Sequence, residues 1–193
     1  YDIEAYTRFV IALMDRLGLE RVVLAGNSLG GHIAWKTAHD HPERVARLIL
    51  VDAAGYAYEP ESIPIGFRLA RNPLFAPLLT RVLPRGTVAA SLRDVYGDPA
   101  RVDEALVDRY FELTLRAGNR RAVAERFRQM KSGEHEGQVA EVRQPTLVLW
   151  GGKDRLIPVK FGERFARELP QGRLVVFAGL GHVPHEEDPV ATV

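Results

Sequence analysis

The feature that most constrains the fold is a serine between glycines, placed directly after an apolar run and directly before a helical pattern. The apolar run, residues 21–25, leads into Gly26-Asn27-Ser28-Leu29-Gly30, and residues 29–39 have helical spacing. A chain that passes from strand to helix this abruptly must turn sharply, and flanking glycines remove side chains that would collide there. The sequence therefore predicts that the Ser28 hydroxyl projects from the end of a strand, although Ser28 as a simple helix cap is the alternative.

Four apolar runs have the composition of buried β-strands. They are residues 21–25, 45–51, 146–150 and 173–178. Apolar residues at helical spacing precede the first run, over residues 3–17, and Pro158 suits the first turn of a helix between the last two runs. Strands of this kind, alternating with helices, indicate right-handed crossovers and a sheet covered on both faces. We therefore expect an α/β protein with a doubly wound, mostly parallel sheet.

Residues 56–140 interrupt this alternation. Six prolines punctuate the segment, and helical spacing follows around residues 87–96, 101–117 and 119–131 without a strand pattern. This organisation predicts a helical insertion between two strands of the sheet. We expect a core made of residues 1–55 and 141–193, and a helical cap or lid made of residues 56–140.

Composition excludes several classes of function. The 193 residues carry 26 basic and 25 acidic side chains, a net charge of +1, which predicts no nucleic-acid partner. No apolar run approaches the ~20 residues of a membrane span. The absence of cysteine rules out thiolate metal sites and cysteine nucleophiles. Because the first residues do not resemble a signal peptide, we expect a cytoplasmic protein, with a signal upstream of residue 1 left open.

A serine nucleophile requires a base, and histidine is the usual one. Of the six histidines, His182 follows the last strand on a flexible Gly179-Leu180-Gly181 loop that can carry it over the sheet edge. His185 lies three residues further on and is the rival. His32 is expected to be a packing residue, and His135, in a polar stretch of the insertion, is expected to be solvated. The sequence favours His182 as the base.

The base in turn needs an acid that fixes its tautomer. Asp154 follows the third strand, and Asp52 follows the second. Both positions are at carboxyl ends of parallel strands, where ligands gather in open α/β sheets, and either aspartate is also suited to cap the next turn. The glycines before Asp154 favour it as the acid, with Asp52 as the alternative.

Taken together, these motifs resemble those of a known family, the α/β-hydrolases. The motifs that carry the resemblance are Gly26-Asn27-Ser28-Leu29-Gly30-Gly31, residues 149–158 around Gly151-Gly152-Lys153-Asp154, and Gly181-His182-Val183-Pro184-His185-Glu186. The order Ser28, Asp154, His182 matches the triad order of that family. The resemblance implies two-step acyl transfer without a metal or organic cofactor, with the backbone N–H of Leu29 as an oxyanion-hole donor.

The resemblance also implies that the four strands are the last four of eight, the C-terminal part of the fold. The family's His-Gly loop, which supplies a second oxyanion amide, has no match, because no histidine here is followed by glycine. We therefore expect an N-terminal segment of the same polypeptide, or another chain, to complete the sheet.

The expected substrate is a small-to-medium hydrophobic carboxylic ester. Apolar side chains in residues 63–83 are expected either to line the site or only to attach the insertion to the sheet; these are Ile63, Ile65, Phe67, Leu69, Leu74, Phe75, Leu78 and Leu79. Meta-cleavage-product hydrolases, which cut carbon–carbon bonds, are the second interpretation. They share the Gly-Asn-Ser-x-Gly-Gly sequence but commonly place tryptophan where Val183 stands. A non-catalytic ligand-binding protein of the same fold is the third.

Overall fold

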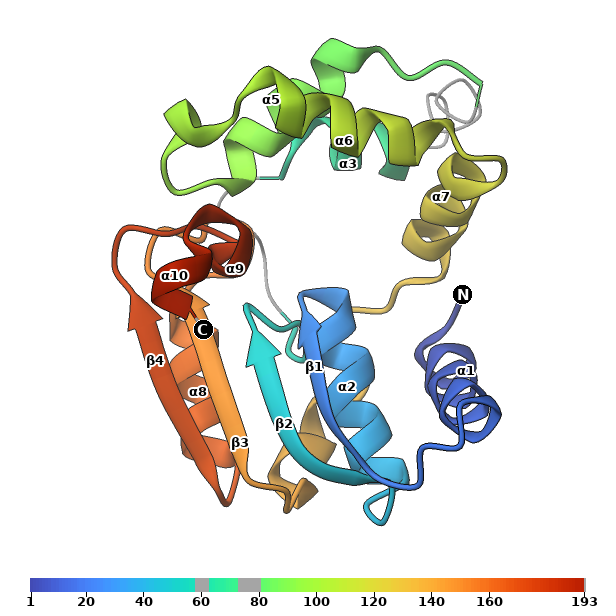
Figure 1. Ribbon diagram of the computed structural model, residues 1–193, viewed down its shortest axis with the longest axis vertical. Helices are drawn as coiled ribbons and strands as arrows, with labels where there is room; N and C mark the ends of the chain where they lie inside the picture. The colour runs from blue at the N-terminus through green and yellow to red at the C-terminus, as the bar shows by residue number, and fades with distance from the viewer. Residues whose placement is uncertain (58–62, 73–80, 193) are drawn as a thin grey trace.

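The computed structural model describes residues 1–57, 63–72 and 81–192, with the backbone alone for residues 69–71. Its centre is a four-stranded parallel sheet in the order β1-β2-β3-β4 (Figure 1). The strands are β1 (Val22–Asn27), β2 (Val45–Val51), β3 (Thr146–Gly151) and β4 (Gly172–Phe177). Asn27 pairs with Val51, and Val51 with Leu149, so the carboxyl ends of neighbouring strands lie at the same edge. The predicted parallel α/β sheet is confirmed.

Two helices cover one face of this sheet and form the main core with it. They are α2 (Leu29–Asp40) and α8 (Lys160–Glu168). Trp35 from α2 and Phe165 from α8 are fully buried against side chains of β2 and β3, among them Leu50 and Trp150. The alternation of strand side chains sends Leu24, Leu48 and Leu50 to this face, and their neighbours in sequence to the other. The site described below is built at the carboxyl edge of this packed unit.

The segment between β2 and β3 is helical, as its sequence pattern predicts. Its described elements are α3 (Ile65–Arg71), α5 (Arg85–Val95), the 3-10 helix η1 (Pro99–Arg101), α6 (Glu104–Leu115), α7 (Asn119–Gln129) and the 3-10 helix η2 (Glu136–Glu141). Figure 1 shows α3, α5 and α6 above the carboxyl ends of the strands. Val88, Leu92 and Val107 form a second cluster of buried side chains there. The boundaries of a separate cap unit stay a prediction.

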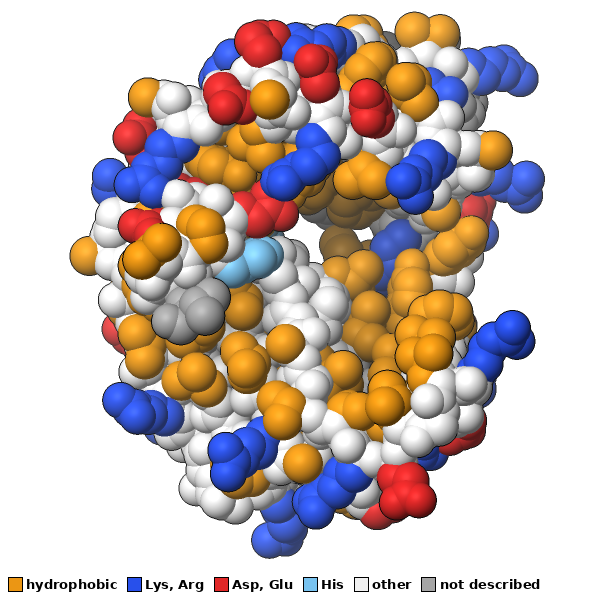
Figure 2. All heavy atoms as spheres, viewed as in Figure 1, with side chains coloured by type: hydrophobic (Ala, Val, Ile, Leu, Met, Phe, Trp, Pro, Cys, Tyr) orange, Lys and Arg blue, Asp and Glu red, His pale blue; other side chains and the backbone are white. Residues whose placement is uncertain are grey.

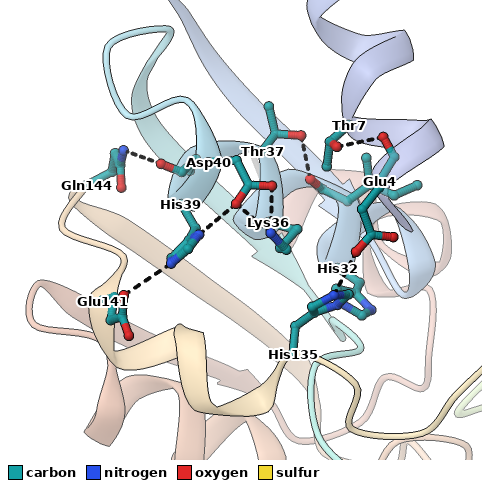
Figure 3. Close-up of polar contacts among 12 residues, drawn as sticks. Glu4, Thr7, His32, Lys36, Thr37, His39, Asp40, His135, Glu141 and Gln144 are labelled. Carbon is teal, nitrogen blue, oxygen red and sulfur yellow. Dashed lines mark hydrogen bonds and ion pairs between the residues drawn. The ribbon is translucent and has the colours of Figure 1, made fainter. Parts of the chain in front are cut away.

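Polar contacts attach the chain returning from α7 to the first helices (Figure 3). His135 places Nε2 2.9 Å from Glu4 of α1 (Ile3–Arg16), and Nδ1 3.4 Å from Nε2 of His32 in α2. With its side chain only 11% exposed, His135 is not the solvated residue that its polar surroundings in the sequence predicted. The returning chain crosses α1 and α2, and this long-range crossing buries it.

The C-terminal elements are two short helices, α9 (Pro184–Glu187) and α10 (Pro189–Thr192). Asp188 caps α10, because its carboxylate accepts the Ala191 N–H at 3.0 Å. None of the helices in the described part of the chain is both long enough and apolar enough to cross a membrane.

Candidate active site

Ser28 occupies the sharp turn between β1 and α2 with an unusual backbone conformation. Its φ of 54° and ψ of −117° lie in a region that residues other than glycine rarely adopt, at a cost of about 1–3 kcal/mol. Its N–H donates to the Val51 carbonyl at 3.0 Å, and its carbonyl accepts the Ala54 N–H at 2.9 Å. The Ser28 side chain makes no capping hydrogen bond to α2, so the interpretation of Ser28 as a simple helix cap is wrong. The strained backbone conformation therefore occurs at a serine whose hydroxyl does not cap the helix.

The glycines of the turn are needed because other backbone passes through the space that a side chain would fill. A Cβ on Gly26 would lie 2.1 Å from the Gly30 carbonyl oxygen, and one on Gly31 would lie 2.4 Å from Ala53 Cβ. Gly30, in contrast, has open space around its would-be Cβ. A side chain is therefore sterically excluded at Gly26 and not at Gly30.

His182 and Asp154 form a buried hydrogen-bonded pair, each 5% exposed. Nδ1 of His182 donates to Asp154 Oδ2 at 2.7 Å. The other oxygen of Asp154 accepts the N–H groups of Leu156 and Ile157 at 2.8 and 3.0 Å, which fixes the carboxylate plane. A proton held on Nδ1 leaves the lone pair on Nε2, which is the arrangement that a general base requires.

Two side chains that the sequence did not single out hold the His182 loop in place. Nδ2 of Asn27 donates to the Val51 carbonyl at 3.1 Å and to the His182 carbonyl at 2.9 Å, so it joins the β1 turn to the loop. The carboxylate of Glu187 accepts the N–H groups of Gly181 at 2.7 Å and Gly97 at 2.8 Å. The only local signal for Asn27 was its place beside Ser28, and nothing local marks Glu187.

The insertion also contacts this loop directly. The Val95 carbonyl, at the end of α5, accepts the His182 N–H at 2.8 Å. A Cβ on Gly97 would collide with the backbone of residues 179–181, which shows how closely the two segments approach. The position of His182 therefore depends on α5 as well as on the sheet.

Asp52, the alternative acid, lies in the same cluster and is fully buried. One oxygen accepts the Gly151 N–H at 2.9 Å, and one carboxylate oxygen lies within 4.8 Å of one ligand atom each of Asp154 and His182. Burial, followed by the negative charge of Asp154, raises the pKa of Asp52 well above its ordinary value. Although three such groups can in principle hold a metal ion, His182 Nδ1 and the Asp154 oxygens are already used in hydrogen bonds. The donor set fits a hydrogen-bonded chain better than a metal site.

The other histidines lie elsewhere. His185 is exposed on α9, and His32 stacks on Trp35 with its ring only 4.8 Å away, as expected of a packing residue. His39 contacts Asp40 and Glu141 at the far end of α2 (Figure 3). Among the histidines in the described chain, His182 alone joins an aspartate at the carboxyl edge of the sheet.

An apolar cavity of about 440 Å³ lies among α3, α5, α6 and α7. Its walls include Phe67, Val88, Leu92, Val95, Leu113 and Val123. Ser91, on the same wall, donates to the Thr87 carbonyl and accepts the Gly66 N–H, so its hydroxyl is already satisfied. Figure 2 shows a hollow between these helices and the sheet, with hydrophobic side chains along part of its wall and charged side chains beside them. Volume and lining suit a hydrocarbon group.

Of the eight apolar residues that the sequence proposed as lining, Phe67 lines this cavity. Ile63 and Ile65 are not among its walls. Leu74, Phe75, Leu78, Leu79 and the side chain of Leu69 lie outside the described residues.

Comparison with known proteins gives the chain a family. A model of the alpha/beta hydrolase fold matches residues 1–189. The hydrolase YugF of Bacillus subtilis is 27% identical over 98% of this chain and 68% of its own length. A 2-hydroxy-6-oxo-6-phenylhexa-2,4-dienoate hydrolase of Comamonas testosteroni is 29% identical over 91% of this chain and 61% of its own length.

Solved structures agree with the sequence relatives. The meta-cleavage product hydrolase CumD of Pseudomonas fluorescens superposes with a TM-score of 0.83 at 22% identity, over all of this chain and 69% of its own. A bacterial membrane phospholipase A superposes with a TM-score of 0.76 at 30% identity, over all of this chain and 60% of its own. The chain thus spans about 60 to 70% of the proteins that it matches. With a family model over nearly its whole length, and with hydrolases among its relatives, this chain belongs to the α/β-hydrolase fold family.

Proposed function

We propose that the protein hydrolyses a carboxylic ester with a hydrophobic acyl or alkyl group through an acyl-enzyme, with Ser28, His182 and Asp154 as the catalytic triad. The observation that carries the proposal is the buried 2.7 Å hydrogen bond between His182 and Asp154. It lies beside a strained turn that carries a serine, and Asn27 joins the two segments. These are the parts that serine acyl transfer needs.

In the proposed mechanism, Ser28 Oγ attacks the ester carbonyl carbon while His182 Nε2 takes the hydroxyl proton. The Asp154 carboxylate stabilises the imidazolium that forms. The ester C–O bond then breaks, and His182 returns the proton to the departing alcohol. Water attacks the acyl-enzyme with His182 again acting as base, which releases the acid and regenerates Ser28.

Leu29 is proposed to donate its backbone N–H to the oxyanion. It opens α2, and N–H groups in the first turn of a helix lack acceptors within the helix. The positive end of the helix dipole adds to the attraction for negative charge at this point. Preorganised donors of this kind are typically among the largest contributors to transition-state stabilisation.

The hydrophobic character of the proposed substrate rests on the apolar cavity among α3, α5, α6 and α7. Val95 connects the cavity to the catalytic loop, because it lines the cavity and its carbonyl accepts the His182 N–H. We propose that residues 56–140 act as a cap, and that a hydrocarbon group in the cavity is thereby linked to the reacting centre. One structural relative, at 30% identity, is a membrane phospholipase A, and that name agrees with this class of substrate.

A second candidate function is hydrolysis of a carbon–carbon bond in a meta-cleavage product. A relative named 2-hydroxy-6-oxo-6-phenylhexa-2,4-dienoate hydrolase and a structural neighbour named meta-cleavage product hydrolase favour it. Val183, where those enzymes commonly carry tryptophan, favours the ester. Parallel assays of the purified protein with medium-chain aryl esters and with a 2-hydroxy-6-oxo-dienoate separate the two, because only the preferred substrate gives a high kcat/KM.

The decisive test is covalent labelling by a fluorophosphonate, which reacts with activated serines. We expect stoichiometric labelling at Ser28, and loss of both labelling and esterase activity in Ser28→Ala. Ser132→Ala is the matched control, because Ser132 is exposed and does not line the cavity. Labelling at another serine would exclude Ser28 as the nucleophile. No labelling of a correctly folded protein would favour a non-catalytic ligand-binding role.

A further inference from the structure

An ionised Asp52 carboxylate would leave one of its two buried oxygens without a hydrogen bond. Its Oδ1 accepts the Gly151 N–H, whereas its Oδ2 is buried and finds no donor among the described residues. Among the charged groups that affect Asp52, the Asp154 carboxyl has the largest effect, and an oxygen of each aspartate lies within 4.8 Å of one of the other. Two carboxylates only repel each other, but a carboxylic acid and a carboxylate can share a hydrogen bond. A single proton therefore satisfies the otherwise unpaired oxygen.

We propose that Asp52 is a positioning residue, a carboxylic acid that donates a hydrogen bond to the Asp154 carboxylate and so extends the chain His182–Asp154 by one member. Its contribution to catalysis rests on the proposed function, whereas the shared proton itself does not. One ring nitrogen or carboxylate oxygen from each of the three side chains lies within 4.8 Å of the other two, and all three residues are buried.

The hydrogen bonds of the two aspartates decide which one carries the proton. Asp154 accepts three donors, the N–H groups of Leu156 and Ile157 and Nδ1–H of His182. Asp52 accepts only one, from Gly151. Donors stabilise a carboxylate, so the negative charge resides on Asp154 and the proton on Asp52. Glu187, held by the N–H groups of Gly97 and Gly181, adds a second nearby negative charge that opposes ionisation of Asp52.

This arrangement keeps one negative charge beside His182 rather than two. The Asp52 donor also withdraws charge from Asp154, which makes Asp154 less able to take the imidazole proton when His182 becomes positively charged. The Asp52 backbone supports the role, because its φ of 42° is a conformation that aspartate and asparagine tolerate better than most residues. Asparagine at this position is therefore a close mimic of the protonated acid.

The first test is an NMR titration of the His182 imidazole in the complete protein and in Asp52→Asn. An asparagine amide can donate to Asp154 and accept from Gly151, so a neutral group replaces a neutral group. We expect the pKa of His182 to change by less than about 0.3 unit. Removal of a full charge within 4.8 Å would instead lower it by about one unit or more. Such a fall would show that Asp52 is ionised and would overturn the proposal.

Asp154→Asn is the matched control, because it removes the charge that the proposal assigns to Asp154. The pKa of His182 should then fall by more than about one unit. If Asp154→Asn leaves the pKa unchanged and Asp52→Asn lowers it, the charge resides on Asp52, and the proposal is wrong. This titration needs no substrate, so its result stands apart from the outcome of the esterase assays.

The second test measures positioning. Asp52→Ala removes the donor to Asp154 and should lower kcat about tenfold, with a smaller change in KM, since one hydrogen bond is lost. Asp52→Asn should keep most of the wild-type kcat. Equal kcat values for Asp52→Ala and the wild type would show that the hydrogen bond positions nothing. If the alanine variant does not fold, the titration of Asp52→Asn still decides where the proton resides.

Discussion

The hydrogen bond between His182 and Asp154 sets a requirement that a carboxylate meets and an amide does not. In Asp154→Asn, the amide can offer its own N–H to Nδ1 of His182, which moves the histidine proton to Nε2 and removes the base. We expect kcat on aryl esters to fall on the order of 10³–10⁴-fold. Asp52→Asn should cost far less. The reverse ranking, measured under the same conditions, would assign the role of acid to Asp52.

His32 predicts a pH dependence of stability that is separate from catalysis. Burial, followed by the charges of His135, Arg126 and Lys36, lowers the pKa of His32 from 6.5 to about 3. Because the unfolded chain takes up this proton more readily than the folded protein, stability is complete above pH 6.5 and is lost progressively as the pH falls towards 3. The loss at pH 5 is about 2 kcal/mol.

The variant His32→Phe isolates this effect, because phenylalanine can stack on Trp35 but cannot titrate. Urea unfolding between pH 7 and pH 4 should show a weaker pH dependence for the variant than for the wild type. Identical slopes for the two proteins would mean that His32 is not held neutral in the folded state.

Single residues could be predicted from sequence where a short motif carries them. Ser28, Asp154 and His182 were each predicted beside glycines at the end of an apolar run. The structure joins His182 to Asp154, and the catalytic roles of the three stay predictions. Asn27 and Glu187 could not be predicted in this way, because their roles arise from contacts with segments 90 to 155 residues away. His135 was placed wrongly in solvent for the same reason.

At the level of elements, the turn from β1 to α2 depends on close contacts that glycine alone permits. Gly31→Ala would place a methyl group 2.4 Å from Ala53 Cβ and 2.9 Å from Ala53 Cα, in the segment that follows β2. We expect a loss of about 1–3 kcal/mol in the free energy of unfolding by urea. Gly30→Ala is the control, because it has nothing within 4 Å, and the expected change is smaller than about 1 kcal/mol. Equal losses would contradict the steric argument.

Periodicity predicted the elements well and their ends less well. The helical patterns around residues 87–96 and 119–131 match α5 and α7 within a few residues. The pattern expected over residues 101–117 includes a 3-10 helix and a break, since Asp103 caps α6 by accepting the Leu106 N–H. An N-cap is indicated by residue type, here an aspartate, and an apolar pattern carries no information about it.

For the molecule as a whole, the uncovered edge of the sheet predicts self-association. Among the described residues, β1 pairs with β2 on one side only, and Val23 on β1 is 56% exposed. Apolar edge strands are templates for further pairing. We expect residues 1–193, expressed alone, to form oligomers or aggregates in light scattering, and Val23→Lys to reduce them.

The control is Val190→Lys, which makes the same chemical change at an 89% exposed position on the short helix α10. It should leave association unaltered. If both lysine substitutions suppress scattering equally, added charge and not the β1 edge is responsible. A monodisperse monomer of the unchanged chain would contradict the prediction itself.

The overall arrangement was predictable only in part. Alternating strands and helices predict a parallel sheet, because nearly all such connections have one hand. How the helices of residues 56–140 attach to the sheet was not predictable, since it depends on single contacts. Examples are the Gly97 N–H on Glu187 and the hydrogen bond of Arg101 to the Glu187 carbonyl. No sequence pattern around Gly97 or Arg101 indicates such a contact.

The hydrogen bond from His182 N–H to the Val95 carbonyl has a consequence for timing. Helix α5 forms a wall of the apolar cavity, and the same helix ends on the loop that carries the proposed base. A displacement of α5 large enough to admit a bulky molecule would also withdraw the acceptor from that loop. Substrate entry and proton transfer by His182 would then take place in turn. Water that reaches the open, empty site would meet His182 out of its catalytic position.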